Sequence, residues 1–113
     1  MWLATKFGFY SIVRKEPADE RDGAVFHVRA RLRHDLENLL HAAGLRKEIE
    51  EWPGADYRYR FLGTEADVHQ VMACLAATLD YNNFKSKIGR TPDQKEKLDA
   101  YHTVWSELAR VQR

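Results

Sequence analysis

Positively charged and aromatic side chains recur on one side of three segments with an alternating pattern, and such a set of residues could bind an anion. Alternate residues of a β-strand point to the same face, so the charged residues separate from the apolar ones. The predicted charged face comprises Lys6, Tyr10 and Arg14, then His27, Arg29 and Arg31, then Arg58 and Arg60. Cationic side chains contact phosphates, and bases stack on aromatic rings. We therefore expect a face that binds nucleic acid or a nucleotide, with Tyr10 as the stacking ring.

The residues predicted to hold the anion are Arg29, Arg31, Arg58 and Arg60. An alternative interpretation is a solvated face, because charged strand faces also protect a sheet from edge-to-edge pairing. Glu48, Glu50 and Glu51 could neutralise these arginines through cross-strand pairs. The 18 Lys and Arg residues against 17 Asp and Glu residues, a formal charge of +1, do not favour an anionic partner.

A second candidate site lies in the segment 80–85, where the helical pattern breaks. Its candidate ligand-binding residues are Tyr81, Asn82, Asn83 and Lys85. A tyrosine can stack, asparagines can hydrogen-bond to amide or base edges, and a lysine can contact an anion, so the segment could line a pocket at the end of the sheet. The competing interpretation is structural, because asparagine at a helix break is a common capping residue.

Sequence motifs for catalysis or metal binding are absent. The chain has no glycine-rich phosphate loop, no paired-cysteine motif and no zinc-protease motif. Its five histidines do not follow a metal-ligand spacing, so we expect no metal and no cofactor. The leading hypothesis is a non-enzymatic binding module for an anionic ligand. The second is a protein-interaction or homodimeric adaptor that uses the charged face. The third is a small enzyme that uses His102 or the 80–85 segment.

The elements that would position these residues follow from hydrophobic periodicity. We expect one strand over 2–15 with the odd-numbered residues facing the core, a turn over 16–23 and a second strand over 24–32. A helix over 34–43 follows, then an uncertain strand over 47–52 and a strand over 57–62. Two further helices follow, the first begun by a Thr64-x-x-Asp67 capping pattern and the last beginning near Thr91.

This order predicts a single compact α+β domain over 1–113, with one antiparallel sheet of three to four strands and helices on one face. The element order is strand, strand, helix, strand, strand, helix, helix. The predicted core comprises Phe7, Phe9, Phe26, Val28, Tyr59, Phe61, Leu75 and Trp105. The alternation directs Arg29 and Arg31 away from that core.

The single cysteine, Cys74, lies in an apolar helical pattern, so no disulfide can form within the chain. The longest apolar run, 71–77, is too short for a membrane helix, and no signal peptide is evident. We therefore expect a cytoplasmic protein with no membrane partner.

Four segments carry a resemblance to a known family: WLATKFGFYSIV, GADYRYRF, LDYNNFK and YHTVWSEL. Together they resemble a family of small bacterial proteins of about this length with no known activity. The resemblance covers nearly the whole chain and implies that the chain is complete. It implies no activity, cofactor or catalytic residue.

Overall fold

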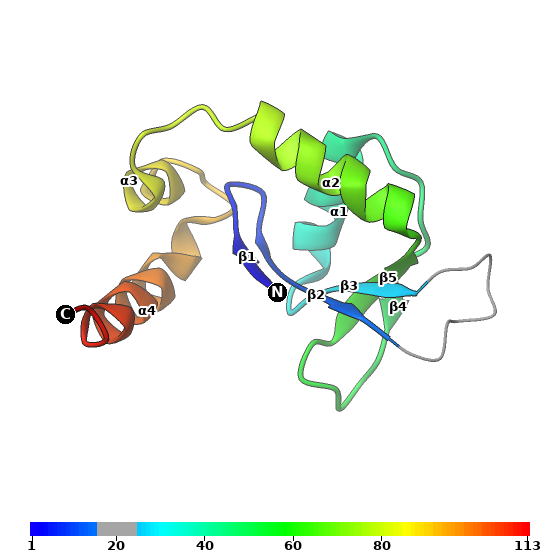
Figure 1. Ribbon diagram of the computed structural model, residues 1–113, viewed down its shortest axis with the longest axis horizontal. Coiled ribbons are helices and arrows are strands. Elements are labelled where there is room, and N and C mark those ends of the chain that lie inside the picture. The colour runs from blue at the N-terminus through cyan, green and yellow to red at the C-terminus, as the bar shows by residue number, and fades with distance from the viewer. Residues whose placement is uncertain (16–24) are drawn as a thin grey trace. The chain divides into compact units, whose positions relative to one another are not determined.

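The computed structural model describes residues 1–15 and 25–113, so the turn predicted over 16–23 lies outside the described residues. These residues group into two compact units, 1–79 and 80–113. Each unit is described by itself below. The ribbon in Figure 1 shows the elements of both units, and their arrangement into one domain stays a prediction.

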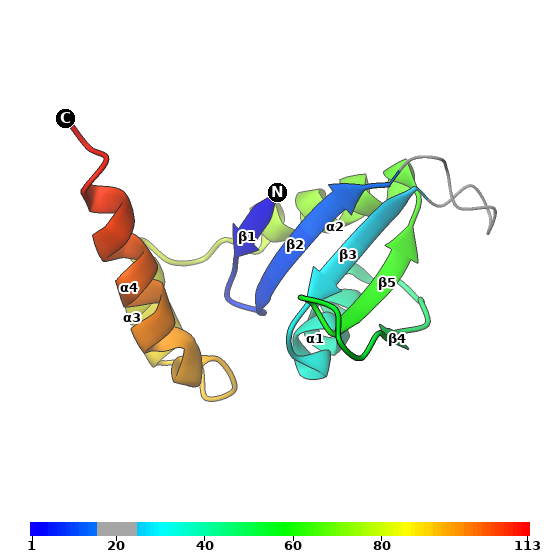
Figure 2. The ribbon, with the colours of Figure 1, turned by 90° about the horizontal axis from the view of Figure 1, so that it is seen from below.

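The first unit holds a five-stranded antiparallel sheet, so the predicted α+β class is confirmed with more strands than expected. Its strands are β1 (Trp2–Ala4), β2 (Phe9–Arg14), β3 (Phe26–Ala30), β4 (Glu50–Glu51) and β5 (Tyr59–Gly63). Their spatial order is β1-β2-β3-β5-β4, and β1 to β5 can be followed in Figure 2. The extra strand arises because 2–15 forms two strands, β1 and β2, instead of one.

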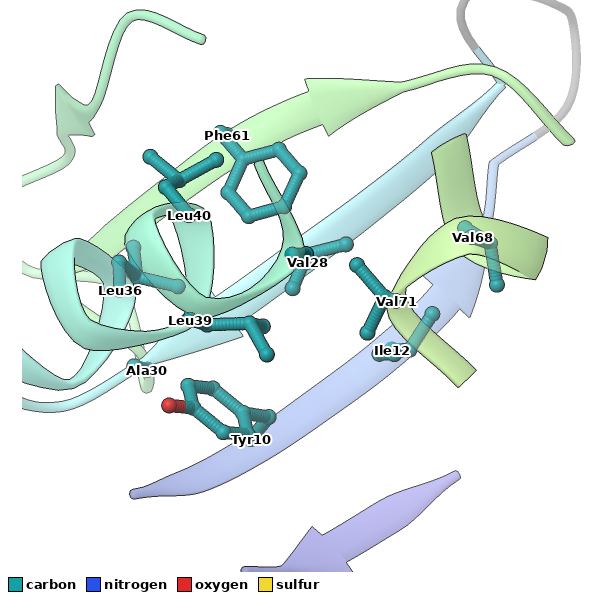
Figure 3. Close-up of a cluster of buried hydrophobic side chains, with 11 residues drawn as sticks. Tyr10, Ile12, Val28, Ala30, Leu36, Leu39, Leu40, Phe61, Val68 and Val71 are labelled. Atoms are coloured by element: carbon teal, nitrogen blue, oxygen red, sulfur yellow. The ribbon is translucent and has the colours of Figure 1, made fainter. Parts of the chain in front are cut away.

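Two helices of the first unit, α1 (Arg33–Ala43) and α2 (Glu65–Ala77), lie on one side of the sheet, as Figure 1 shows. Leucines at helical spacing on α1 and valines on α2 pack against the inward residues of β2, β3 and β5 (Figure 3). The core comprises Tyr10, Ile12, Val28, Ala30, Leu36, Leu39, Leu40, Ala43, Phe61, Val68 and Val71. The other side of the sheet contributes no residue to this cluster.

Local sequence signals place the ends of these helices. The C-cap of α1 is Gly44, whose φ of 68° is favourable for glycine. The predicted capping box of α2 is confirmed, because the Thr64 side chain accepts from the Asp67 amide and Asp67 accepts from the Thr64 amide. Burial works to raise the pKa of Asp67, but hydrogen bonds from Lys47 and Thr64 outweigh it and lower that pKa.

The predicted first strand is interrupted by a turn between Thr5 and Gly8. The Thr5 hydroxyl donates to the Gly8 carbonyl at 2.9 Å and accepts from the Gly8 amide at 3.2 Å. After this turn the even-numbered residues face the core, so Tyr10 and Ile12 are buried in it. The expectation that Phe9 faces the core is therefore wrong, and so is the placement of Tyr10 on the charged face.

The second unit consists of α3 (Phe84–Gly89), a 3-10 turn over Lys95–Lys97 and α4 (Leu98–Ala109). Tyr101 is the buried residue of α4, and its ring meets Phe84 edge-on at 4.9 Å. Trp105 is 58% exposed, so its predicted burial in the core is wrong. Trp105 stacks on His102 and lies 4.1 Å from the Lys85 Nζ, so its ring meets polar side chains and not an apolar core.

Candidate functional site

The side of the sheet opposite α1 and α2 carries the candidate site, and we call it the open face. The strand register aligns Ser11 of β2, Arg29 of β3, Arg60 of β5 and Glu50 of β4 in one row across it. Arg29 and Arg60 are direct cross-strand neighbours in this row. The alternation of β3 and β5 therefore places both arginines on the open face, as the sequence predicted.

Arg60 is the most buried cation of the open face, at 4% exposure. Its guanidinium carbon lies 3.9 Å from the centroid of the Trp52 ring, a cation–π contact. Its Nη2 donates to the Tyr57 carbonyl at 3.3 Å, and its Nη1 lies 3.2 Å from Nδ1 of His27. Burial lowers the pKa of Arg60, the charge of Arg29 lowers it further, and the charge of Glu50 acts in the opposite direction.

Arg29 and Arg31 share one aromatic ring. The guanidinium carbons of Arg29 and Arg31 lie 4.8 Å and 4.4 Å from the centroid of Tyr57. Arg29 also donates from Nη2 to Ser11 Oγ at 2.6 Å. The alternation over 57–62 predicts Tyr57 on the core side with Tyr59 and Phe61, but Tyr57 is absent from the core cluster and lies against these arginines. It precedes the first residue of β5, so strand alternation does not govern its direction.

Two hydrogen-bond donors on this face have no acceptor among the described residues. The Nε atoms of Arg29 and Arg60 are buried and make no hydrogen bond to the described part of the chain. Within residues 1–15 and 25–113, neither arginine forms an ion pair with a carboxylate. Guanidinium groups stay protonated in proteins, so two adjacent positive charges have no countercharge in direct contact from the part of the chain that the structure describes.

Arg58 differs from these two arginines, because it is exposed and its Nε donates to Glu51 Oε1 at 2.8 Å. The hydrogen bond and the charge of Glu51 raise the pKa of Arg58. The alternative interpretation of an ion-paired face thus holds for Arg58. Glu50, in turn, accepts a hydrogen bond from the Trp52 indole at 3.1 Å.

Three residues expected on the charged face lie elsewhere. Tyr10 is fully buried, and its hydroxyl donates to the Asp35 carbonyl at 2.5 Å. Lys6 lies in the turn between β1 and β2, with its Nζ over the Phe7 ring. Arg14 follows the same alternation as Tyr10 and Ile12, because the turn reverses the predicted faces. Because Tyr10 is buried, it cannot stack on a ligand, and the prediction of that role is wrong.

The second candidate site belongs to the second unit. Asn83 caps α3, since its side chain accepts from the Ser86 amide at 2.9 Å. The Lys85 Nζ lies 4.1 Å from the Trp105 ring centroid and 3.4 Å from Nδ1 of His102. Burial raises the pKa of Tyr81, and the charge of Asp80 adds to that effect. Capping by Asn83 is confirmed, whereas ligand binding by Tyr81, Asn82, Asn83 and Lys85 stays a prediction.

Three aromatic residues of the open face lie outside the set of binding residues that the sequence predicts. Trp52 follows β4 and precedes the Pro53-Gly54 turn, where φ of Gly54 is 88°, and Tyr57 lies at the other end of the same loop. The only sequence signal for these two is that their loop joins the acidic strand to the basic one. Trp2 lies on the predicted charged side of its strand and is exposed there.

No cluster of three or more potential metal ligands occurs among the described residues. None of the helices in the described part of the chain has the length and apolar character that a membrane crossing needs. Comparison with protein-family models, with curated proteins and with solved structures finds no match to this chain.

Proposed function

We propose that this protein is a binding module whose open face holds an anionic ligand, a single-stranded nucleic acid or a nucleotide. The observation that supports the proposal most directly is the side-by-side placement of Arg29 and Arg60, each with a buried Nε that has no acceptor in the described part of the chain. An unpaired buried donor costs about 1–3 kcal/mol. An anion that accepts from these groups removes that cost and screens the repulsion between the two charges.

Aromatic rings beside the cations favour a nucleotide over a simple inorganic anion. Trp52 presents an exposed indole next to Arg60, and an indole face can stack on a base. Arg31 is exposed and can reach a phosphate. An antiparallel sheet suits this role because the side opposite the packed helices can carry exposed side chains, as it does at Trp2 and Trp52.

The test compares two open-face variants with one control, using fluorescence anisotropy of a labelled mixed oligonucleotide pool. Arg31→Ala and Arg29→Gln should each weaken binding about tenfold, since hydrogen bonds to charged groups contribute about 1.5–3 kcal/mol. Each should also reduce the slope of log affinity against log salt by about 0.7. Arg46→Ala removes an exposed arginine between α1 and β4 and should change neither quantity.

Absence of binding by the unmodified protein at low salt, or equal weakening by all three substitutions, would overturn the proposal. The adaptor hypothesis for the same face is less favoured because its acidic strand is already engaged within the chain: Glu51 pairs with Arg58, and Glu50 accepts from Trp52. Sedimentation velocity supplies the check, since a homodimer on this face would dissociate when the oligonucleotide binds.

A further inference from the structure

The open face has a second aromatic position, on the edge strand β1, whereas the Trp52 ring lies over Arg60 of β5. Trp2 of β1 is 72% exposed, more than any other large apolar side chain among the described residues. Its ring lies 6.2 Å from that of Phe9 on β2. Because Trp2 pairs with Ser11, and Ser11 accepts from Arg29, Trp2 belongs to the same row as the two arginines.

The row therefore runs from an aromatic residue on an edge strand, through a basic centre, to a second aromatic ring. It begins at Trp2 on β1, passes Ser11 and Arg29, and ends at Arg60 on β5, over which the Trp52 ring lies. Three strand spacings separate β1 from β5, a distance of about 14 Å. At the stacked rise of about 3.4 Å per nucleotide, about five nucleotides cover this distance, and fewer cover it in an unstacked strand.

We infer that the ligand is a single-stranded oligonucleotide that crosses the sheet, with one base stacked on Trp2 and another on Trp52. Its phosphates contact Arg29 and Arg31 between the two rings. This inference rests on the proposed function and adds the orientation and length of the ligand. A mononucleotide or dinucleotide is too short to reach both aromatic rings, so it can stack on only one of them at a time.

The test measures the affinity of a thymidine dinucleotide and of a thymidine octanucleotide by isothermal titration calorimetry. The octanucleotide should lose about tenfold in affinity for Trp2→Ala and a similar factor for Trp52→Ala, as expected for one stacked base each. The affinity ratio of octanucleotide to dinucleotide should fall in Trp2→Ala. An octanucleotide can bind in several registers, which raises its apparent affinity over that of a dinucleotide. This statistical gain is the same for the parent and the variant, so it does not lower the ratio.

Trp105→Ala is the matched control, because Trp105 is an exposed tryptophan of the second unit, and it should leave both affinities unchanged. If Trp2→Ala binds the octanucleotide as tightly as the parent while Trp52→Ala does not, the crossing orientation is wrong and the proposed function stands. If the parent binds neither ligand at low salt, the proposed function itself fails. Because Trp2 is largely exposed, its substitution leaves the core packing intact.

Discussion

Tyr10→Ala should destabilise the protein by about 3–5 kcal/mol, as expected for loss of a large buried aromatic side chain. Tyr10 is fully buried among the core residues, and its hydroxyl donates to the Asp35 carbonyl. Urea unfolding followed by circular dichroism measures the change. Substitution of an exposed open-face residue such as Trp2 should instead alter binding and leave the free energy of unfolding nearly unchanged.

The neighbouring residue provides the control for that experiment. Phe9 precedes Tyr10 on β2, points to the open face and contacts Trp2, so Phe9→Ala should cost about 1 kcal/mol or less. The two substitutions remove aromatic rings from consecutive positions of one strand. A larger loss of stability for Phe9→Ala than for Tyr10→Ala would show that the faces of β2 are assigned the wrong way round.

Gly8→Ala should destabilise the protein by about 1–3 kcal/mol through overpacking. A Cβ atom on Gly8 would overlap the side chain of Asp35. Asp35 is 1% exposed and accepts a hydrogen bond from the Phe9 amide at 3.3 Å, so it cannot move away without losing that bond. Thermal or urea unfolding of the single variant measures the cost.

A double-mutant cycle shows whether the cause is this contact. In an Asp35→Ala background the space next to Gly8 is larger, so Gly8→Ala should cost less there than in the parent. Residues in direct contact show such non-additivity, whereas independent sites add. Additive costs would mean that Gly8 matters for the backbone of the turn and not for its close approach to α1.

The sequence predicts the part of the open face that comes from β3 and β5. In β3, Val28 and Ala30 alternate with Arg29, and a shift of one residue would bury that charge unpaired. The same constraint places Phe61 of β5 in the core and Arg60 on the opposite face. Where one face is buried and the other charged, alternation alone determines direction.

The first strand illustrates where this approach fails. Its alternating pattern continues through Gly8 without a visible break, yet Thr5 folds the backbone into a turn there and exchanges the two faces. Both sides of the segment carry aromatic residues, so a reversed assignment carries no evident cost in the pattern. The reversed assignment places Tyr10 in the predicted site, whereas the structure buries Tyr10 in the core and leaves Trp2 on the open face beside Ser11.

The aromatic partners of the arginines could not be predicted for a different reason. Trp52 and Tyr57 lie in the segment between β4 and β5, outside the strands themselves, where no periodicity indicates a direction. Their positions depend on contacts across the sheet, from Trp52 to Arg60 and from Tyr57 to Arg29. Trp105 differs from these two residues because it lies on a regular apolar stripe of a helix, and that stripe predicts burial. The contact between α3 and α4 leaves the Trp105 side chain exposed.

The most direct measurement of the central claim uses the three tryptophan indole N–H signals in a ¹⁵N-labelled sample. Trp2 reports on the β1 edge of the open face, Trp52 reports on its centre at Arg60, and Trp105 reports on the second unit. Titration with a thymidine octanucleotide at low salt should shift the Trp2 and Trp52 signals along one saturation curve and leave the Trp105 signal in place. Unchanged Trp2 and Trp52 signals throughout the titration would contradict the assignment of the open face as the binding surface.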